Sequence, residues 1–117
     1  MDCKLHHKKI YYFQIYLINR TFEKAEMIKE TFNDITIQKW GDIPEFDIVI
    51  NATSVGLNKE NFDLDLNKFG NNKFFYDVIY NPKETNFLKE AKANGNKTEN
   101  GRMMFIYQAH QSFALWN

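Results

Sequence analysis

The chain has 117 residues, a length that fits one domain. Hydrophobic residues make up 44% of it and aromatic residues 16%, which excludes an intrinsically disordered composition. Its 15 Lys and Arg residues balance its 15 Asp and Glu residues, so the net charge provides no field that would attract nucleic acid or an anionic membrane.

Cysteine usage and apolar run lengths bear on the compartment. Cys3 is the one cysteine of the sequence, so no disulfide can form within the chain, which fits a reducing compartment. No apolar run is long enough to cross a bilayer. Residues 1–13 are partly basic and lack the continuous apolar segment of a signal peptide. We therefore expect a cytoplasmic protein with no membrane partner.

The first predicted elements are a strand and a helix. Residues 10–18 are rich in β-branched and aromatic side chains, and their second half, 14–18, is predicted to be a buried strand. After a polar break, apolar residues recur at spacings of three, three and four: Phe22, Ala25, Ile28 and Phe32. This spacing predicts one face of a helix of about three turns. Thr21 stands where an N-cap hydroxyl would lie.

Further strands and helices alternate along the rest of the chain. Apolar runs predict strands at 36–40, 47–50 and 73–79. A short helix and turn is expected at 62–69, and helices are expected at 85–93 and 101–116, the former closed by Asn94-Gly95 as a left-handed cap. The run 47–50 has the character of a strand buried on both faces, as in a parallel sheet.

This alternation predicts an α/β fold with a mainly parallel sheet. Ligands of such sheets bind beyond the carboxyl ends of the strands. Three segments occupy that position, at 19–21, 51–54 and 80–82.

Each strand end allows a functional and a structural interpretation. In a dinucleotide-binding fold, an arginine such as Arg20 accommodates a ribose 2′-phosphate, but Arg20 also fits a solvated loop beside an ordinary N-cap. The small residues of 51–56 allow close approach of a ligand to the backbone, or form a simple turn. Asp77 lies in an apolar strand, where a buried carboxylate needs partners, and we expect a structural role for it.

The last helix carries an amide among apolar residues. Met104 and Gln108 are four residues apart and therefore share a helix face. That face could line a ligand cleft. The pattern alone favours a core helix in which Gln108 is hydrogen-bonded locally.

Four segments in this order resemble the shikimate dehydrogenases, the NADP-dependent oxidoreductases of aromatic amino-acid biosynthesis. They are NRTFEKA at 19–25, DIVINATSVG at 47–56, FFYDVIYNPKETNFLKEAKANG at 74–95 and NGRMMFIYQAHQSFALW at 100–116. The resemblance covers residues 15–116. It implies an incomplete Rossmann-like, doubly wound fold, with a non-matching segment at 1–13 and a truncated NADP-binding domain at 14–117.

The resemblance also implies roles for individual residues. It implies that a first set binds the cofactor NADP: Asn19, Arg20, Thr21, Asn51, Ala52, Thr53, Val78, Gly101 and Met104. Tyr80 and Gln108 match residues that reach the substrate, shikimate or 3-dehydroshikimate. Arg20 would then hold the 2′-phosphate.

Several parts of the family pattern are missing from the sequence. Nothing matches the substrate domain with its catalytic lysine and aspartate, so we assign no catalytic residue. Histidines near Lys8 and Lys9 lack metal-ligand spacing, so no metal site is expected. The glycine-rich turn is absent, and Met103 and Arg102 replace the family's usual glycine and apolar residue. Loss of the strand before that turn should expose the edges of its two neighbours.

The resemblance therefore predicts a member of the shikimate dehydrogenase family. The family reaction is the reversible reduction of 3-dehydroshikimate to shikimate with NADPH, and we expect this chain to be inactive alone. The alternatives are a non-catalytic NADP-binding module and a module that self-associates through exposed sheet edges.

Overall fold

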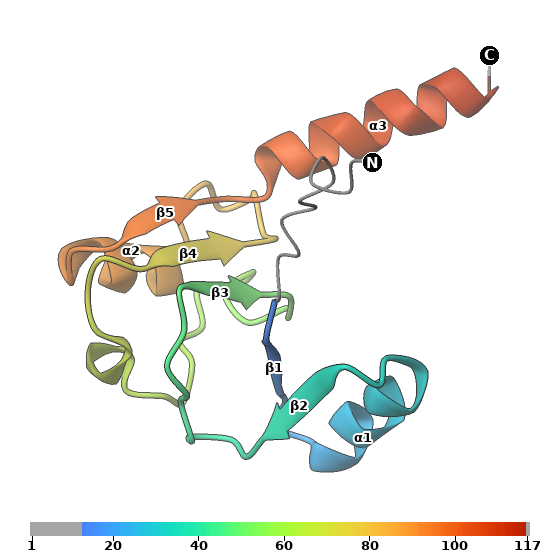
Figure 1. The fold of residues 1–117 in the computed structure, drawn as a ribbon. Coiled ribbons are helices and arrows are strands. Elements are labelled where there is room, and N and C mark those ends of the chain that lie inside the picture. Colours follow the sequence, from blue (N-terminus) through green and yellow to red (C-terminus); the bar gives the residue numbers. More distant parts are fainter. Residues whose placement is uncertain (1–12, 117) are drawn as a thin grey trace, which may run out of the picture. The chain divides into compact units, whose positions relative to one another are not determined.

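The computed structural model describes residues 13–116, and the chain divides into two compact units between Pro44 and Glu45. Figure 1 shows the strands and helices of both units. The segment 1–13, apart from Phe13, lies outside the described residues, as do the histidines and lysines near its end. Within 13–116, no helix is long and apolar enough to span a membrane.

The first unit is one β–α–β element. Strand β1 (Ile15–Ile18) leads into helix α1 (Phe22–Thr31), and the chain returns in strand β2 (Ile35–Gln38). The two strands are parallel, with Ile15 opposite Ile35. Ala25 on α1 and Ile35 on β2 are buried, which fixes the helix against the strand pair. The predicted strand at 36–40 begins and ends earlier, because the chain turns where Asp42 N donates to Lys39 O.

Two expectations for α1 need correction. Thr21 occupies the N-cap position, but its side chain forms no capping hydrogen bond. Of the four residues of the predicted apolar face, Ala25 is buried, whereas Phe22, Ile28 and Phe32 are exposed. A single helix on a two-stranded sheet covers too little surface to bury a whole helix face.

The second unit contains a three-stranded parallel sheet in the order β3-β4-β5 (Figure 1). Its elements in chain order are β3 (Ile48–Asn51), the 3-10 helix η2 (Leu66–Phe69), β4 (Phe74–Asp77), α2 (Asn86–Ala93), β5 (Lys97–Glu99) and α3 (Arg102–Trp116). Helix α2 packs against β4 and β5. Phe75 lies at the centre of the core, with its ring 5.2 Å from that of Phe87 and 5.8 Å from that of Phe69.

The predicted α/β class and parallel pairing are confirmed, as are the strand at 73–79 and the helix at 85–93 within a few residues. Gly95 adopts the expected left-handed conformation, with φ +85°. Strand β5 was not predicted. The segment 62–69 is helical only from Leu66.

The expectation that β3 is buried on both faces is wrong. Asn51 is buried and Val49 half-buried, but Ile48 is 58% exposed and Ile50 59% exposed. Successive residues of a strand point to opposite faces, so Ile48 and Ile50 share the open face. Among the described strands β3 pairs only with β4, and β1 only with β2. The two small sheets therefore each present an unpaired edge in this part of the chain.

Helix α3 also differs from expectation. Its extent agrees with the prediction, but none of its residues is buried, so the core-helix interpretation is wrong. Apolar residues are spread around the whole helix rather than gathered on one face, and no single packing surface can cover them. Gln108 is exposed and needs no local partner.

Candidate functional site

The residues at 19–21 form the turn between β1 and α1 in the first unit. Asn19 Nδ2 donates to Thr21 O at 2.8 Å, which closes the turn. Arg20 and Thr21 are exposed, and Arg20 has no ion-pair partner among residues 13–116. Because Thr21 does not cap the helix, its hydroxyl and the first N–H groups of α1 remain available to an anion. Glu23 and Lys24 in the same turn balance each other in charge.

The residues at 51–55 form a loop that its own side chains organise. Asn51 is 3% exposed. Its Nδ2 donates to Val55 O at 3.0 Å and to Asp77 Oδ1 at 3.2 Å. Its Oδ1 accepts from Thr53 N at 2.9 Å and from Thr53 Oγ1 at 2.7 Å. Ala52 and Thr53 are exposed, so these two residues of the loop face solvent.

Asp77 is fully buried and structural, as expected. Its Oδ1 accepts from Asn51 Nδ2 and from Ile79 N, the latter at 3.0 Å. Its Oδ2 accepts from Thr85 Oγ1 at 2.7 Å. Thr85 also accepts from Leu88 N, as the N-cap of α2. One carboxylate therefore joins the ends of β3 and β4 to the start of α2.

Val78 and Gly101 lie against each other. A Cβ on Gly101 would come within 1.9 Å of Val78 O and 2.5 Å of its carbonyl carbon. Gly101 N donates to Ile79 O at 3.2 Å, and Phe105 N donates to Gly101 O at 3.0 Å. The glycine is therefore required here for the contact that starts α3 beside the end of β4.

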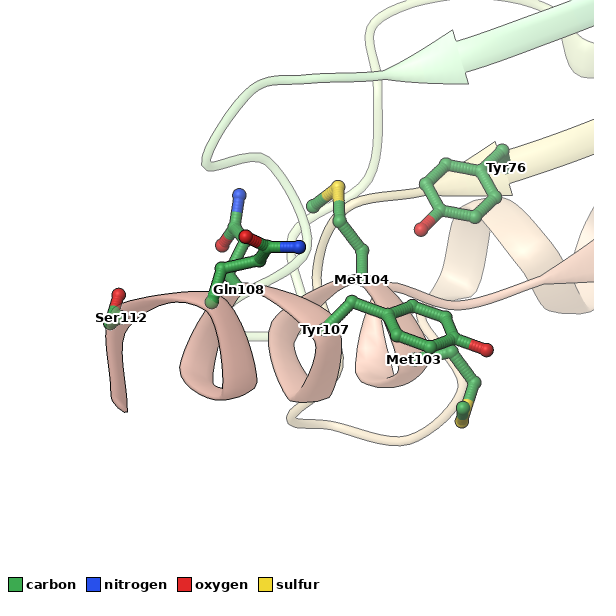
Figure 2. A pocket seen from close by; sticks show the side chains of 7 residues that line it. Tyr76, Met103, Met104, Tyr107, Gln108 and Ser112 are labelled. Carbon is green, nitrogen blue, oxygen red and sulfur yellow. The ribbon is translucent and has the colours of Figure 1, made fainter. Parts of the chain in front are cut away.

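An open cleft of about 700 Å³ borders α3 from Met103 to Ser112 (Figure 2). Met104 and Gln108 line it together, as the sequence predicts for one helix face, and Tyr76 of β4 lies on the same side in Figure 2. Its other lining residues are Met103, Tyr107, Gln111 and Ser112. The predicted substrate residue Tyr80 does not line this cleft. Its ring stacks on Phe105, with centroids 4.7 Å apart.

Sequence reasoning missed three of these partners. Thr85 was expected only as a helix start, and Phe105 and Tyr76 carried no signal beyond their apolar surroundings. Within 13–116, no group of three or more His, Cys, Asp or Glu could hold a metal ion.

Most of the similar proteins are named as shikimate dehydrogenases. No protein-family model matches the chain. The curated NADP(+) shikimate dehydrogenase of Pelagibacter ubique is 54% identical over 94% of this chain and 42% of its own length. A solved shikimate dehydrogenase in complex with NADP+ is 36% identical, with a TM-score of 0.74 over 89% of this chain and 41% of its own. A 5-ketofructose reductase of Gluconobacter is also 36% identical, with a TM-score of 0.72 over 81% of this chain and 38% of its own.

The chain spans about two fifths of the length of the curated relatives that it matches. Over that span the chain is similar in sequence and in fold to the shikimate dehydrogenases.

Proposed function

We propose that this chain forms the NADP-binding part of a shikimate dehydrogenase, with residues 14–117 as the cofactor domain. The activity is the reversible reduction of 3-dehydroshikimate to shikimate in the cytoplasm. The bound cofactor would supply the hydride. For these 117 residues by themselves we expect no turnover, because no motif for the general acid–base lysine is present in them.

The observation that carries this proposal is the exposed Arg20 and Thr21 pair at the start of α1. A guanidinium offers a rigid fork of donors that matches phosphate oxygens. Arg20 is not engaged by a carboxylate among the described residues, and the Thr21 hydroxyl is not used as a cap. Both groups therefore fit a ribose 2′-phosphate, and Asn19 holds the turn that presents them.

The cleft on α3 suits the nicotinamide end of the cofactor and the substrate beside it. Met104 offers an apolar surface for a flat ring, and Gln108 offers both a donor and an acceptor for hydroxyl groups. Tyr80 is 43% exposed and retains its hydroxyl for a substrate, while Phe105 supports its ring. Val78 and the backbone at Gly101 would lie beside the nicotinamide.

The test is a titration of the chain with NADP and with NAD, followed in two-dimensional amide spectra. We expect NADP to bind more tightly, and Arg20→Ala to abolish that preference. A charge-assisted hydrogen bond contributes about 1.5–3 kcal/mol, which is at least tenfold in Kd. Lys24→Ala removes a cation from the same turn and should keep the preference. Equal affinity for NADP and NAD in the unmodified chain would refute the proposed role of Arg20.

A second candidate, self-association, has its own observation. Ile48 and Ile50 expose an apolar patch on β3, the strand with an unpaired edge in the described part of the chain. Sedimentation velocity over a range of concentrations tests it: Ile50→Lys should abolish oligomers that form regardless of nucleotide. A monomer at all concentrations would exclude this function.

A further inference from the structure

The hydrogen bonds of Asn51 leave it no capacity for a ligand. A side-chain amide has two N–H donors and an oxygen with two lone pairs. In Asn51 both donors are used, by Val55 O and Asp77 Oδ1, and both lone pairs are used, by the Thr53 N–H and hydroxyl. With 3% of its surface exposed, Asn51 is also out of reach of a cofactor.

The same bonds make Asn51 the connection between a loop and a buried anchor. On one side it holds Thr53, whose Oγ1 in turn accepts from Val55 N at 3.1 Å. On the other side it is joined to Asp77, which is fully buried and fixed by Ile79 N and Thr85 Oγ1. We call Asn51, Thr53, Val55 and Asp77 the Asn51 latch.

We propose that Asn51 is a positioning residue: it does not bind the cofactor, but holds the exposed residues Ala52 and Thr53 in the conformation that does. This inference rests on the proposed function. A loop held in its bound conformation before binding loses less conformational freedom when the ligand arrives. The latch also reaches Ile79, next to Tyr80, so the same anchor sets the cofactor loop and the strand end on the substrate side.

The chain offers a matched control in Asn96. It too is buried, and its amide is also bonded to backbone groups: Oδ1 accepts from Lys73 N at 2.9 Å, and Nδ2 donates to Gly70 O and Ala91 O at 3.0 Å. Asn96 precedes β5 and Lys73 precedes β4, so this network lies at the amino ends of the strands. Asn51 lies at the carboxyl end of β3. Asn51→Ala and Asn96→Ala thus make the same chemical change at opposite ends of one sheet.

The first measurement is amide hydrogen exchange without nucleotide. In Asn51→Ala the amides of Thr53 and Val55 should lose their protection, whereas Asn96→Ala should deprotect Lys73 and leave the loop unchanged. Asn51→Asp is the second variant, for the case that the alanine variant does not fold. It keeps the acceptor for Thr53 but replaces the donor to Asp77 by a carboxylate oxygen, and the repulsion between the two carboxylates should displace the loop and lower its protection as well. Unchanged protection in the folded Asn51 variants would overturn the latch itself.

The second measurement is the NADP titration of the folded variants. Asn51→Ala and Asn51→Asp should raise the Kd by about tenfold or more, and Asn96→Ala should leave it within about twofold. A wild-type Kd in the Asn51 variants, or an equal loss in Asn96→Ala, would overturn the positioning role. If the unmodified chain binds no NADP, the proposed function fails and the positioning role fails with it, while the exchange data still report whether the latch exists.

Discussion

Gly101→Ala tests whether the start of α3 is fixed by contact with Val78. The added methyl group would lie 1.9 Å from Val78 O and 3.0 Å from Val78 Cα. Ordinary contact between a methyl carbon and an oxygen needs a separation about 1.5 Å greater, since atoms attract only near 3.5 Å and repel steeply below it. The atoms in the way are backbone, so no side chain can rotate to make room.

The expected cost follows from what must move. Opening the contact by that distance would break the bond from Gly101 N to Ile79 O, which is already 3.2 Å long. A lost hydrogen bond costs about 1 kcal/mol, and overpacking about 1–3 kcal/mol. Replacing glycine returns about 0.4–1 kcal/mol through the unfolded chain. We expect a net loss of about 2 kcal/mol, which corresponds to a fall in Tm of roughly 8–16 °C for a unit of this size.

Thermal unfolding followed by circular dichroism measures this loss. Gly41→Ala is the control, because a methyl group there meets no atom within 4 Å and only the φ of +95° penalises it. That strain costs about 1 kcal/mol. Amide spectra should also show shifts along α3 in Gly101→Ala, at Met104 and Gln108. A variant at least as stable as the wild type, with α3 unshifted, would refute the packing role and favour a glycine kept for the cofactor alone.

Two further predictions concern the carboxylates of the second unit. Asp77→Ala leaves three buried donors without an acceptor, at about 1–3 kcal/mol each, and should unfold the unit, whereas Asp77→Asn keeps the shape and should stay folded in a urea titration. Hydrogen bonds from the backbone N–H groups of Glu60, Asn58 and Gly56 lower the pKa of Glu60 below its ordinary 4.5. The stabilisation of this loop is therefore complete above pH 4.5 and is lost as the pH falls through the lowered value. The Gly56 and Asn58 amide signals should report a midpoint below 4.5, and a midpoint at or above 4.5 would contradict the hydrogen bonds.

The parts of the fold that the sequence predicted are those with an apolar pattern. Strand β4 carries the buried Phe75, and α2 carries Phe87, Leu88 and Ala91 on one face, so both have a periodic signal. Strand β5 has none, because Lys97-Thr98-Glu99 is polar and short. It forms through backbone pairing with β4, and this pairing leaves no pattern in the side chains of the sequence. The burial of β3 was mispredicted for a related reason: an apolar run shows that a strand can be covered on both faces, not that it is.

The sequence predicted where along the chain the residues of the candidate site lie, but not what each residue does. The rule that ligands meet the carboxyl ends of parallel strands selected 19–21 and 51–54 correctly as strand ends, whereas 80–82 begins three residues after β4 ends at Asp77. Whether a polar residue there faces a ligand or the protein depends on its hydrogen bonds, and these join Asn51 to Asp77 across 26 residues of sequence. A contact between residues so far apart in the chain cannot be inferred from a single sequence.

The residues of the candidate site fall into two groups. Those of the frame use their hydrogen-bonding groups within the chain, and the others leave them open to a ligand. The frame consists of Asn51, Asp77 and Gly101, which are fully engaged in contacts within the chain. These residues determine where neighbouring groups lie, but they do not contribute to selectivity between ligands. Arg20 and Gln108 are exposed, and no other side chain within residues 13–116 engages their donors, so under the proposed function these are the groups that discriminate between ligands. Substitutions of these frame residues should therefore lower the affinity for all ligands together. Arg20→Ala should instead change the ratio of NADP to NAD affinity and leave the fold intact.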